Sequence, residues 1–516
     1  MVERPVDLPR RRAWRAAAFV AGLLLTLAFA PRNIWPLALA CPAFLIWLWS
    51  RAPGAREGAW LGFAFGLGTF SAGTWWLYIS IHVFGQAPVW VAFIVMAALV
   101  LIMAAYYGAL GYAVVRWLPT RSPLGLLVAI PAAWLLLEWW RGWFLSGFPW
   151  LSLGYTQTDT WLAGFAPVGG VYLVSALLLV GAGALVLLLQ SRDRWRWVAL
   201  ALLLAPWAIG APLRAVQWTR SDGAAVDVAI AQGAIPQDMK WLASNRDAIL
   251  DTYERLHREA LGARLIVWPE SALPDLVNNL APYVGAAWSA ADARGSTVLM
   301  GVMRLADDNV NYYNSVLALG DGEPAFYDKH HLVPFGEYFP VPGWVRSWLR
   351  LMSLPNSDFT AGGDRQGPLV AGGLRVATSI CYEDAYTGIH FASRQSQLLV
   401  NVTNDAWFGH SAARYQHLQI SRMRAAESRR CLLRAANDGV SAIVGPGGEV
   451  VATAPEFKPA VLRGRILPQS GDTPYLVAGN APIIGLAALA VSFATLRRRK
   501  LNRGPQVQTL TGTREV

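Results

Sequence analysis

Apolar residues are distributed very unevenly along the chain. They form long, almost uncharged runs within residues 13–210 and 475–496, whereas the stretch between them alternates short apolar and polar segments. A helix that crosses the hydrocarbon core of a bilayer needs about 20 predominantly apolar residues. By this criterion we predict eight membrane-spanning helices, at residues 13–30, 35–50, 58–81, 88–117, 123–140, 166–190, 195–212 and 474–496.

The same pattern divides the chain into domains. We expect an N-terminal membrane domain of seven spans (1–215), a globular domain (220–470), an eighth span (474–496) and a basic tail (497–516). The composition agrees, because only 15% of the 516 residues are charged, against about 25% in typical soluble domains. The chain is therefore predicted to be a multi-pass membrane protein with one large domain outside the bilayer.

Positive charge recurs at every second end of the predicted spans. Arginines cluster before the first span and after the second, fourth, sixth and eighth: Arg10–Arg12, Arg51 and Arg56, Arg116 and Arg121, Arg192, Arg194 and Arg196, and Arg497–Arg499. Loops that stay in the cytoplasm carry such an excess of Lys and Arg. We therefore predict that both termini are cytoplasmic and that the globular domain is exported. These clusters also account for the net charge of +11, so we do not expect nucleic-acid binding.

The globular segment alternates short apolar runs with helical patterns. We expect strands at residues 226–231, 265–268, 297–303, 313–319, 374–380, 398–403 and 442–444, and helices at 244–261, 282–294 and 414–428. Nearly continuous apolar strands that alternate with helices are typical of an α/β sheet whose faces are covered.

Three polar residues follow apolar runs in this segment and together could carry out covalent acyl chemistry. Glu270 and Cys381 directly follow expected strands, and Lys329 ends the run 325–328. The carboxyl ends of strands are where α/β sheets place active sites. A thiol needs a base to remove its proton and a cation to stabilise developing charge. We therefore interpret Cys381 as the nucleophile, Glu270 as the general base, and Lys329 and the backbone N–H of Tyr382 as oxyanion donors.

Each of these residues also has an ordinary structural explanation. A Glu or Lys after a strand is usually a solvated loop residue, and a lone Cys is usually a small buried hydrophobe. The chain has three cysteines, an odd number that implies no disulfide framework. No glycine-rich phosphate loop and no Cys/His cluster of metal-ligand spacing occurs, so we expect neither a cofactor nor a metal.

The sequence around the three residues resembles a known family. Trp268-Pro269-Glu270, Lys329 followed by 332–337 (Leu-Val-Pro-Phe-Gly-Glu), and Ser379-Ile-Cys-Tyr-Glu383 resemble the nitrilase, or carbon–nitrogen hydrolase, superfamily. That resemblance implies a Glu-Lys-Cys triad on an αββα sandwich. With eight spans around it, the chain is similar to the apolipoprotein N-acyltransferase family of the bacterial inner membrane. Stretches 232–237, 401–409 and 138–150 agree.

The resemblance also implies substrates and further site residues. The acyl donor would be a glycerophospholipid, typically phosphatidylethanolamine, and the acceptor the α-amine of an S-diacylglyceryl-cysteine at an apolipoprotein N-terminus. The catalytic domain would lie on the periplasmic side, in a protein expected to be a monomer. Trp241, Glu337, Tyr382 and Glu383 would support the site: Trp241 as a pocket wall or plain core residue, Glu337 as a proton relay, a partner of Lys329 or a turn cap, Tyr382 as a lining residue and Glu383 as a holder of the local loop.

Three alternatives remain open at this stage. The aromatic loop 141–160 could anchor the protein at the bilayer interface or line a lipid entrance. Segment 339–355 could be a mobile amphipathic arm or a helix packed on the domain. The chain could also be a membrane-anchored hydrolase of a small amide or nitrile, although a single anchor would then suffice. Acyl transfer and hydrolysis differ in the fate of the acyl chain, which is either transferred to an amine or released by water.

Overall fold

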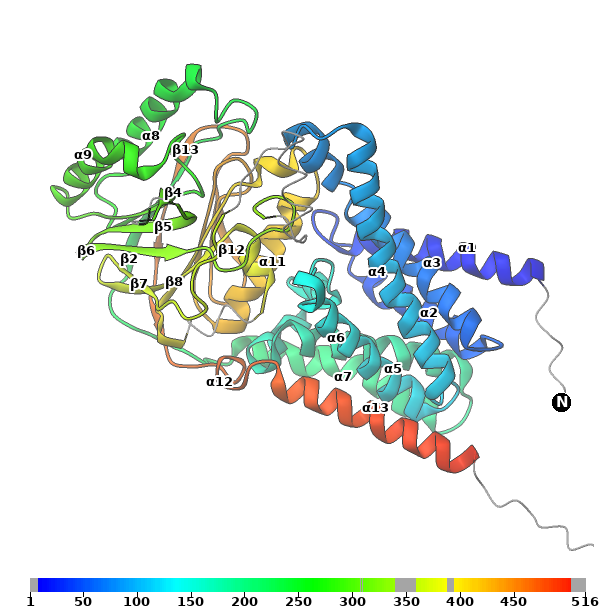
Figure 1. Ribbon diagram of the computed structural model, residues 1–516. Coiled ribbons are helices and arrows are strands. Elements are labelled where there is room, and N and C mark those ends of the chain that lie inside the picture. The colour runs from blue at the N-terminus through cyan, green and yellow to red at the C-terminus, as the bar shows by residue number, and fades with distance from the viewer. Residues whose placement is uncertain (1–7, 307, 309, 339–358, 388–393, 503–516) are drawn as a thin grey trace, which may run out of the picture.

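The computed structural model describes residues 8–306, 308, 310–338, 359–387 and 394–502 (Figure 1). The hypothesis of a mobile arm at 339–355 and most of the predicted tail therefore lie outside the described residues. Within them, a bundle of long helices lies beside an α/β domain, and α13 runs along the outside of the bundle.

Each predicted span overlaps a helix of the bundle. These helices are α1 (Leu8–Leu25), α2 (Pro36–Arg51), α3 (Ala55–Gly73), α4 (Val89–Trp117), α5 (Ile130–Arg141), α6 (Ala166–Gln190), α7 (Trp195–Ala215) and α13 (Ala481–Asn502). Four stretches are long and apolar enough to cross a membrane, at Val89–Trp117, Trp161–Gln190, Trp195–Ala215 and Ala481–Leu501. The described residues thus provide four candidate spans rather than eight.

Two predicted spans are interrupted. The expected helix 58–81 ends at Gly73, where the Thr74 hydroxyl donates to the carbonyl of Phe70 and closes the helix end, and a separate helical turn follows at Ile79–Phe84. The expected span 474–496 is divided into two helices. A short helix, α12 (Pro474–Ala478), stops at Gly479 in the left-handed region (φ +61°), and α13 then begins at Ala481 and includes the basic residues assigned to the tail.

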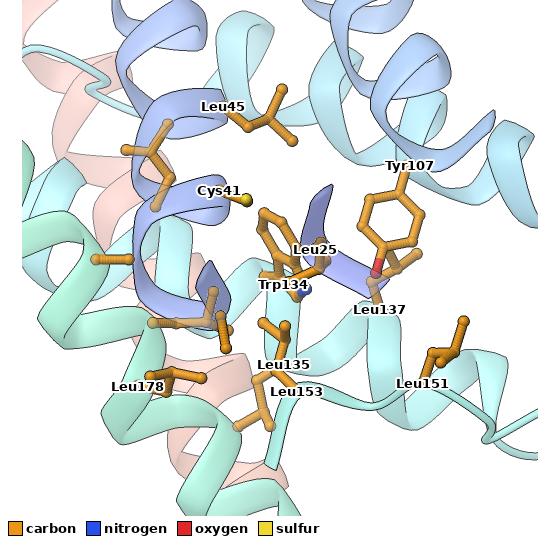
Figure 2. Close-up of a cluster of buried hydrophobic side chains, with 14 of the residues drawn as sticks. Leu25, Cys41, Leu45, Tyr107, Trp134, Leu135, Leu137, Leu151, Leu153 and Leu178 are labelled. Carbon is orange, nitrogen blue, oxygen red and sulfur yellow. The ribbon is translucent and has the colours of Figure 1, made fainter. Parts of the chain in front are cut away.

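The helices of the bundle approach each other closely. A Cβ placed on Gly62 of α3 would lie 2.1 Å from the carbonyl oxygen of Tyr107 on α4, so only glycine permits this approach. Small residues serve the same purpose between membrane helices generally. Beyond this contact, Trp134 and Tyr107 lie in a continuous buried cluster with leucines from several helices (Figure 2).

The α/β domain contains two six-stranded sheets. One has the order β13-β2-β3-β4-β5-β6, with bounds Ala460–Ile466, Val226–Gln232, Leu265–Trp268, Thr297–Leu305, Tyr312–Gly320 and Gly322–Asp328. The other has the order β12-β11-β10-β9-β8-β7, with bounds Val450–Thr453, Ala442–Val444, Leu432–Ala436, Leu398–Thr403, Leu374–Ile380 and Leu369–Ala371. A short pair, β1 (Arg220–Ser221) and β14 (Gln469–Ser470), joins the two ends of the domain.

Three separate hydrophobic clusters define the layers of this domain. One fills the space between the two sheets. A second lies between the first sheet and helices α8 (Arg246–Ala260) and α9 (Ala281–Asp292), and a third lies between the second sheet and α11 (Ala413–Ser428). The order of layers is therefore helix, sheet, sheet, helix, as expected for an αββα sandwich.

Helix α11 also faces the membrane bundle (Figure 1). Its residues Ile420 and Met423 belong to the same buried cluster as the bundle core. The Glu427 carboxylate accepts a hydrogen bond from the backbone N–H of Val171 on α6 at 2.7 Å. The α/β domain is thus fastened to the bundle through the helix that covers its second sheet.

Candidate active site

Cys381 sits on a sharp turn at the end of β8. The residue has a φ of +53° and begins a short 3-10 helix, Cys381–Ala385. A non-glycine residue in the left-handed region is costly and persists only where its surroundings hold it. Here the carbonyl of Cys381 accepts hydrogen bonds from Asn401 Nδ2 (3.3 Å) and from His417 Nε2 (3.1 Å). The turn leaves Cys381 partly exposed at the end of the sheet.

Glu270 follows β3, and only 6% of the residue is exposed. Its Oε1 accepts a hydrogen bond from Asn314 Nδ2 at 2.7 Å, and its Oε2 accepts one from the backbone N–H of Asn404 at 2.8 Å. The two bonds fix the plane of the carboxylate between the sheets. Because β3 and β8 belong to different sheets, the site forms where the ends of the two sheets meet.

Lys329 follows the last residue of β6 and is almost fully buried. Its Nζ lies 2.7 Å from Glu337 Oε1 and 3.5 Å from Glu270 Oε1. Burial opposes the charged form, but Glu337 and Glu270 outweigh it and raise the pKa of Lys329 above its ordinary range. The side chain is therefore a permanent ammonium in the site.

The thiol of Cys381 responds to the same charges. Burial, followed by the negative charge of Glu270, raises the pKa of the thiol well above its ordinary range, while Lys329 opposes the rise. The charges of Glu270 and Lys329 thus both act on the thiol of Cys381. In the resting site the thiol keeps its proton, so the arrangement suits a nucleophile that is activated by a neighbouring base during the reaction.

The four predicted supporting residues occupy different places. Glu337 contacts Lys329 directly, and its Oε2 accepts the backbone N–H of Val333 at 2.8 Å. Glu383 is fully buried and accepts the backbone N–H groups of His330 (2.7 Å) and Ile380 (2.7 Å), so it ties the segment after Lys329 to the Cys381 turn. Trp241 is 45% exposed and therefore is not a core residue.

Tyr382 points toward the membrane bundle. Its ring stacks on that of Trp150, with centroids 5.9 Å apart. Trp150 belongs to the aromatic loop 141–160, in which Trp150 is buried while Trp143 and Leu145 are exposed. One side chain of the loop, Trp150, thus packs against the turn that begins at Cys381, while Trp143 and Leu145 are exposed.

Sequence reasoning missed several residues that contact the site. The amide of Asn314 bridges the two carboxylates, donating to Glu270 and, at 3.2 Å, to Glu337. Lys240 is fully buried with its Nζ 3.5 Å from the carbonyl of Glu270, and burial lowers its pKa to about 8. His417 contacts the carbonyl of Cys381. Asn314 lies within a strand, and no local sequence pattern distinguishes it. Lys240 could have been found in the sequence because it adjoins Trp241, a predicted site residue.

The chain is similar in sequence to known proteins over most of its length. Residues 21–184 match the profile of the apolipoprotein N-acyltransferase N-terminal domain, and residues 227–472 match that of carbon-nitrogen hydrolases. Apolipoprotein N-acyltransferases from Pseudomonas paraeruginosa and Azotobacter vinelandii are each 41% identical to the chain, covering 93% and 95% of it and 95% and 96% of their own lengths. The protein of that name from Ralstonia nicotianae is 41% identical over 96% of the chain and 95% of its own length. The chain therefore belongs to the apolipoprotein N-acyltransferase family, within the carbon–nitrogen hydrolase superfamily.

Proposed function

We propose that this chain moves an acyl group from a glycerophospholipid, through a thioester on Cys381, to the α-amine of an S-diacylglyceryl-cysteine at a lipoprotein N-terminus. The observation that carries the proposal is the environment of Cys381. The charges of Glu270 and Lys329 both act on the pKa of its thiol. Helix α11, which covers the second sheet of the same domain, packs against candidate membrane spans. Phosphatidylethanolamine is the expected donor, and a monomer is the expected form.

In the first half-reaction Glu270 takes the proton of Cys381 as Sγ attacks the sn-1 ester carbonyl of the donor. The negative charge that develops on the carbonyl oxygen is stabilised by the Lys329 ammonium and the backbone N–H of Tyr382. The ester C–O bond then breaks. Glu270 returns the proton to the departing oxygen, which leaves as a lysophospholipid, and the thioester remains.

In the second half-reaction the acceptor amine attacks the thioester carbonyl. Glu270 now accepts a proton from the attacking nitrogen, the C–S bond breaks, and the proton passes to Cys381 Sγ. An amide forms and the thiol is restored. These groups account for every proton and electron pair, so the proposed reaction requires no cofactor or metal.

The supporting residues divide by role in this proposal. Glu337 keeps Lys329 in position, since its Oε1 is the nearer carboxylate oxygen to the ammonium. Glu383 holds the loop and does not react. The half-exposed indole of Trp241 and the ring of Tyr382 line the approach to the site.

The proposed topology follows from the charge pattern. We infer a multi-pass protein of the bacterial inner membrane with membrane domain 1–215, periplasmic catalytic domain 220–470 and cytoplasmic termini. Eight spans are inferred, the last being α13 and the four shorter helices α1, α2, α3 and α5 crossing as well. Pairing of β1 with β14 supports these limits for the catalytic domain.

An intact-mass experiment tests the function. Purified protein is incubated with phosphatidylethanolamine alone, in parallel with Cys381→Ser and with Cys431→Ser as a matched control for a buried thiol. We expect wild type and Cys431→Ser to gain the mass of one acyl chain and to lose it when a diacylglyceryl-cysteine peptide is added. We expect no thioester on Cys381→Ser. Discharge by water, with no transfer to the peptide, would instead identify a hydrolase. Absence of any adduct would contradict the proposal.

A further inference from the structure

Behind the Cys381 turn lies a cluster of charged side chains that the proposed chemistry does not use. It consists of His417 on α11, Asp384 in the turn itself, Asp405 just after β9, and Arg434 on β10. All four side chains are fully buried. Burying charge is costly unless every charge is paired and hydrogen-bonded, so the cluster needs a physical explanation.

The imidazole of His417 contacts three oxygen atoms. Its Nδ1 lies 2.9 Å from Asp405 Oδ1, and its Nε2 lies 3.0 Å from Asp384 Oδ1 and 3.1 Å from the carbonyl oxygen of Cys381. Burial opposes ionisation of both aspartates, but Arg434 and His417 outweigh it, and the pKa of each lies below its ordinary value. Ionised carboxylates and carbonyls only accept, so both ring nitrogens must donate. His417 is therefore an imidazolium.

The charges of the cluster then sum to zero. Arg434 Nη2 lies 2.8 Å from Asp405 Oδ2, and Arg434 Nη1 lies 3.6 Å from Asp384 Oδ2. Two carboxylates balance one guanidinium and one imidazolium, whereas a neutral His417 would leave a buried negative charge beside the nucleophile. The pKa of His417 agrees: burial and Arg434 lower it, but Asp384 and Asp405 more than compensate and raise it to about 8.

This cluster touches the nucleophile through its backbone. The Cys381 carbonyl, which His417 holds, belongs to a residue with a φ of +53°, and relaxing that turn would swing both the thiol and the next N–H group. Asp405 also acts on the thiol directly, since its charge raises the pKa of Cys381. His417 contacts both the Cys381 carbonyl and the Asp405 carboxylate, so it bears on the turn and on the charge that acts on the thiol.

We propose that His417 is a positioning residue for the nucleophile: its imidazolium holds the carbonyl of Cys381 in the strained turn, and its charge offsets that of Asp405 on the thiolate. This inference rests on the proposed role of Cys381 and deepens it. His417 acts through Cys381 and does not contact substrate.

The membrane domain completes the arrangement. The ring of Trp150, from the aromatic loop, lies 5.6 Å from that of His417, and Trp150 Nε1 donates to Gln416 Oε1 on the same helix at 2.7 Å. The cluster is therefore covered by the bundle, which keeps water from the buried charges. Docking of the two domains and orientation of the nucleophile thus depend on the same helix, α11.

Alkylation of Cys381 by iodoacetamide measures this effect without any lipid substrate. The rate is followed by intact mass against pH in the full-length protein, with Cys381→Ser as the blank. In His417→Gln we expect alkylation at about pH 8 to slow about tenfold, equivalent to a rise of one unit in the thiol pKa. In Asp405→Asn/His417→Gln the charge that raises the thiol pKa is removed together with the charge that offsets it, and we expect a rate within about threefold of wild type.

His257→Gln is the matched control, because His257 is also buried in the α/β domain but its Nε2 donates to the Ala287 carbonyl on α9. It should leave the alkylation profile unchanged. A wild-type profile in His417→Gln, or a double variant as slow as the single one, would overturn the proposal. If wild-type protein formed no thioester, the proposed function would be contradicted instead. Failure of the inference on His417 and failure of the proposed function are therefore distinguishable.

The wild-type protein provides a second measurement should His417→Gln not fold. The groups that face His417 are Asp384 and Cys381 from the turn, Asp405 from the loop after β9, Arg434 from β10 and, through Asp384, Arg424 from α11 itself. As His417 loses its proton above about pH 8, the thiolate becomes less favourable. The logarithm of the alkylation rate should then rise with a slope below one, and a slope of one up to the plateau would contradict the inference.

Discussion

Lys329 lies closer to Glu337 than to Glu270: its Nζ is 2.7 Å from Glu337 Oε1 and 3.5 Å from Glu270 Oε1. The Lys329 ammonium is therefore held mainly by Glu337, which transfers no proton in the proposed mechanism. The amide of Asn314 donates to both carboxylates and bridges them. In the proposed mechanism, Glu337 keeps Lys329 in place while Glu270 exchanges protons with the thiol.

Replacing Glu337 by Gln should weaken that hold. Loss of a charge-assisted hydrogen bond is worth ~1.5–3 kcal/mol, so we expect thioester formation to slow about 10- to 100-fold. Single-turnover acylation followed by intact mass measures the effect. Asp247→Asn, whose side chain is 91% exposed on α8, is the control. Wild-type acylation in Glu337→Gln would show that Glu270 alone positions Lys329.

Glu383→Gln should act on stability as well as activity. The carboxylate accepts four hydrogen bonds, from the N–H groups of His330, His331 and Ile380 and from the Tyr327 hydroxyl. A Gln side chain places an NH₂ group against one pair of these donors whichever way it is turned, which should cost about 3 kcal/mol.

The midpoint of thermal unfolding measures this cost, and Glu259→Gln, at an exposed position, provides the comparison. We expect a lower midpoint for Glu383→Gln alone. An unchanged midpoint combined with lost acyl transfer would indicate a direct chemical role for Glu383 rather than a structural one.

Lys240 should make stability depend on alkaline pH. Burial lowers the pKa of Lys240 from 10.5 to about 8, so the folded state is penalised wherever the unfolded chain is protonated. The penalty, about 3 kcal/mol, is complete below about pH 8 and disappears as the pH rises through 10.5. Lys240→Met should therefore be more stable than wild type at neutral pH.

The difference in unfolding midpoint between wild type and Lys240→Met, measured from neutral to strongly alkaline pH, tests this expectation. Lys458→Met, at an exposed position, should show no such dependence. A difference that stays constant with pH would mean that Lys240 has the same pKa in the folded and unfolded protein, so that its burial is compensated by stronger pairing than its contact with the Glu270 carbonyl suggests.

Trp241→Ala should weaken substrate binding with little effect on folding. The indole is 45% exposed and has the buried Lys240 ammonium 5.7 Å from its ring centroid. Removing an exposed aromatic wall should cost about 1–3 kcal/mol of binding, seen as a raised KM in mixed micelles. Trp161→Ala, at a more exposed position of 57%, is the control. An unfolding midpoint lowered by several degrees would show instead that Trp241 is structural.

Much of the fold could be predicted because local patterns carried it. Three strands were predicted with their observed bounds: Leu265–Trp268, Leu374–Ile380 and Leu398–Thr403. Short apolar runs between polar turns seldom form any other element of secondary structure. Strand Leu432–Ala436 was missed because Arg434 interrupts its apolar run. Arg434 is buried only because two aspartates distant in sequence neutralise it.

The sequence by itself predicted the division into membrane and α/β parts and selected Glu270, Lys329 and Cys381 as candidate catalytic residues, because hydropathy and short motifs are local properties. The tertiary structure decided which groups surround them. Asn314 and His417 reach the site only because β5 and α11 pack beside it. The left-handed turn at Cys381 and the break at Gly479 were likewise set by contacts and backbone geometry that no run of residues encodes on its own. A local motif selects a candidate nucleophile, but packing between distant segments orients its side chain.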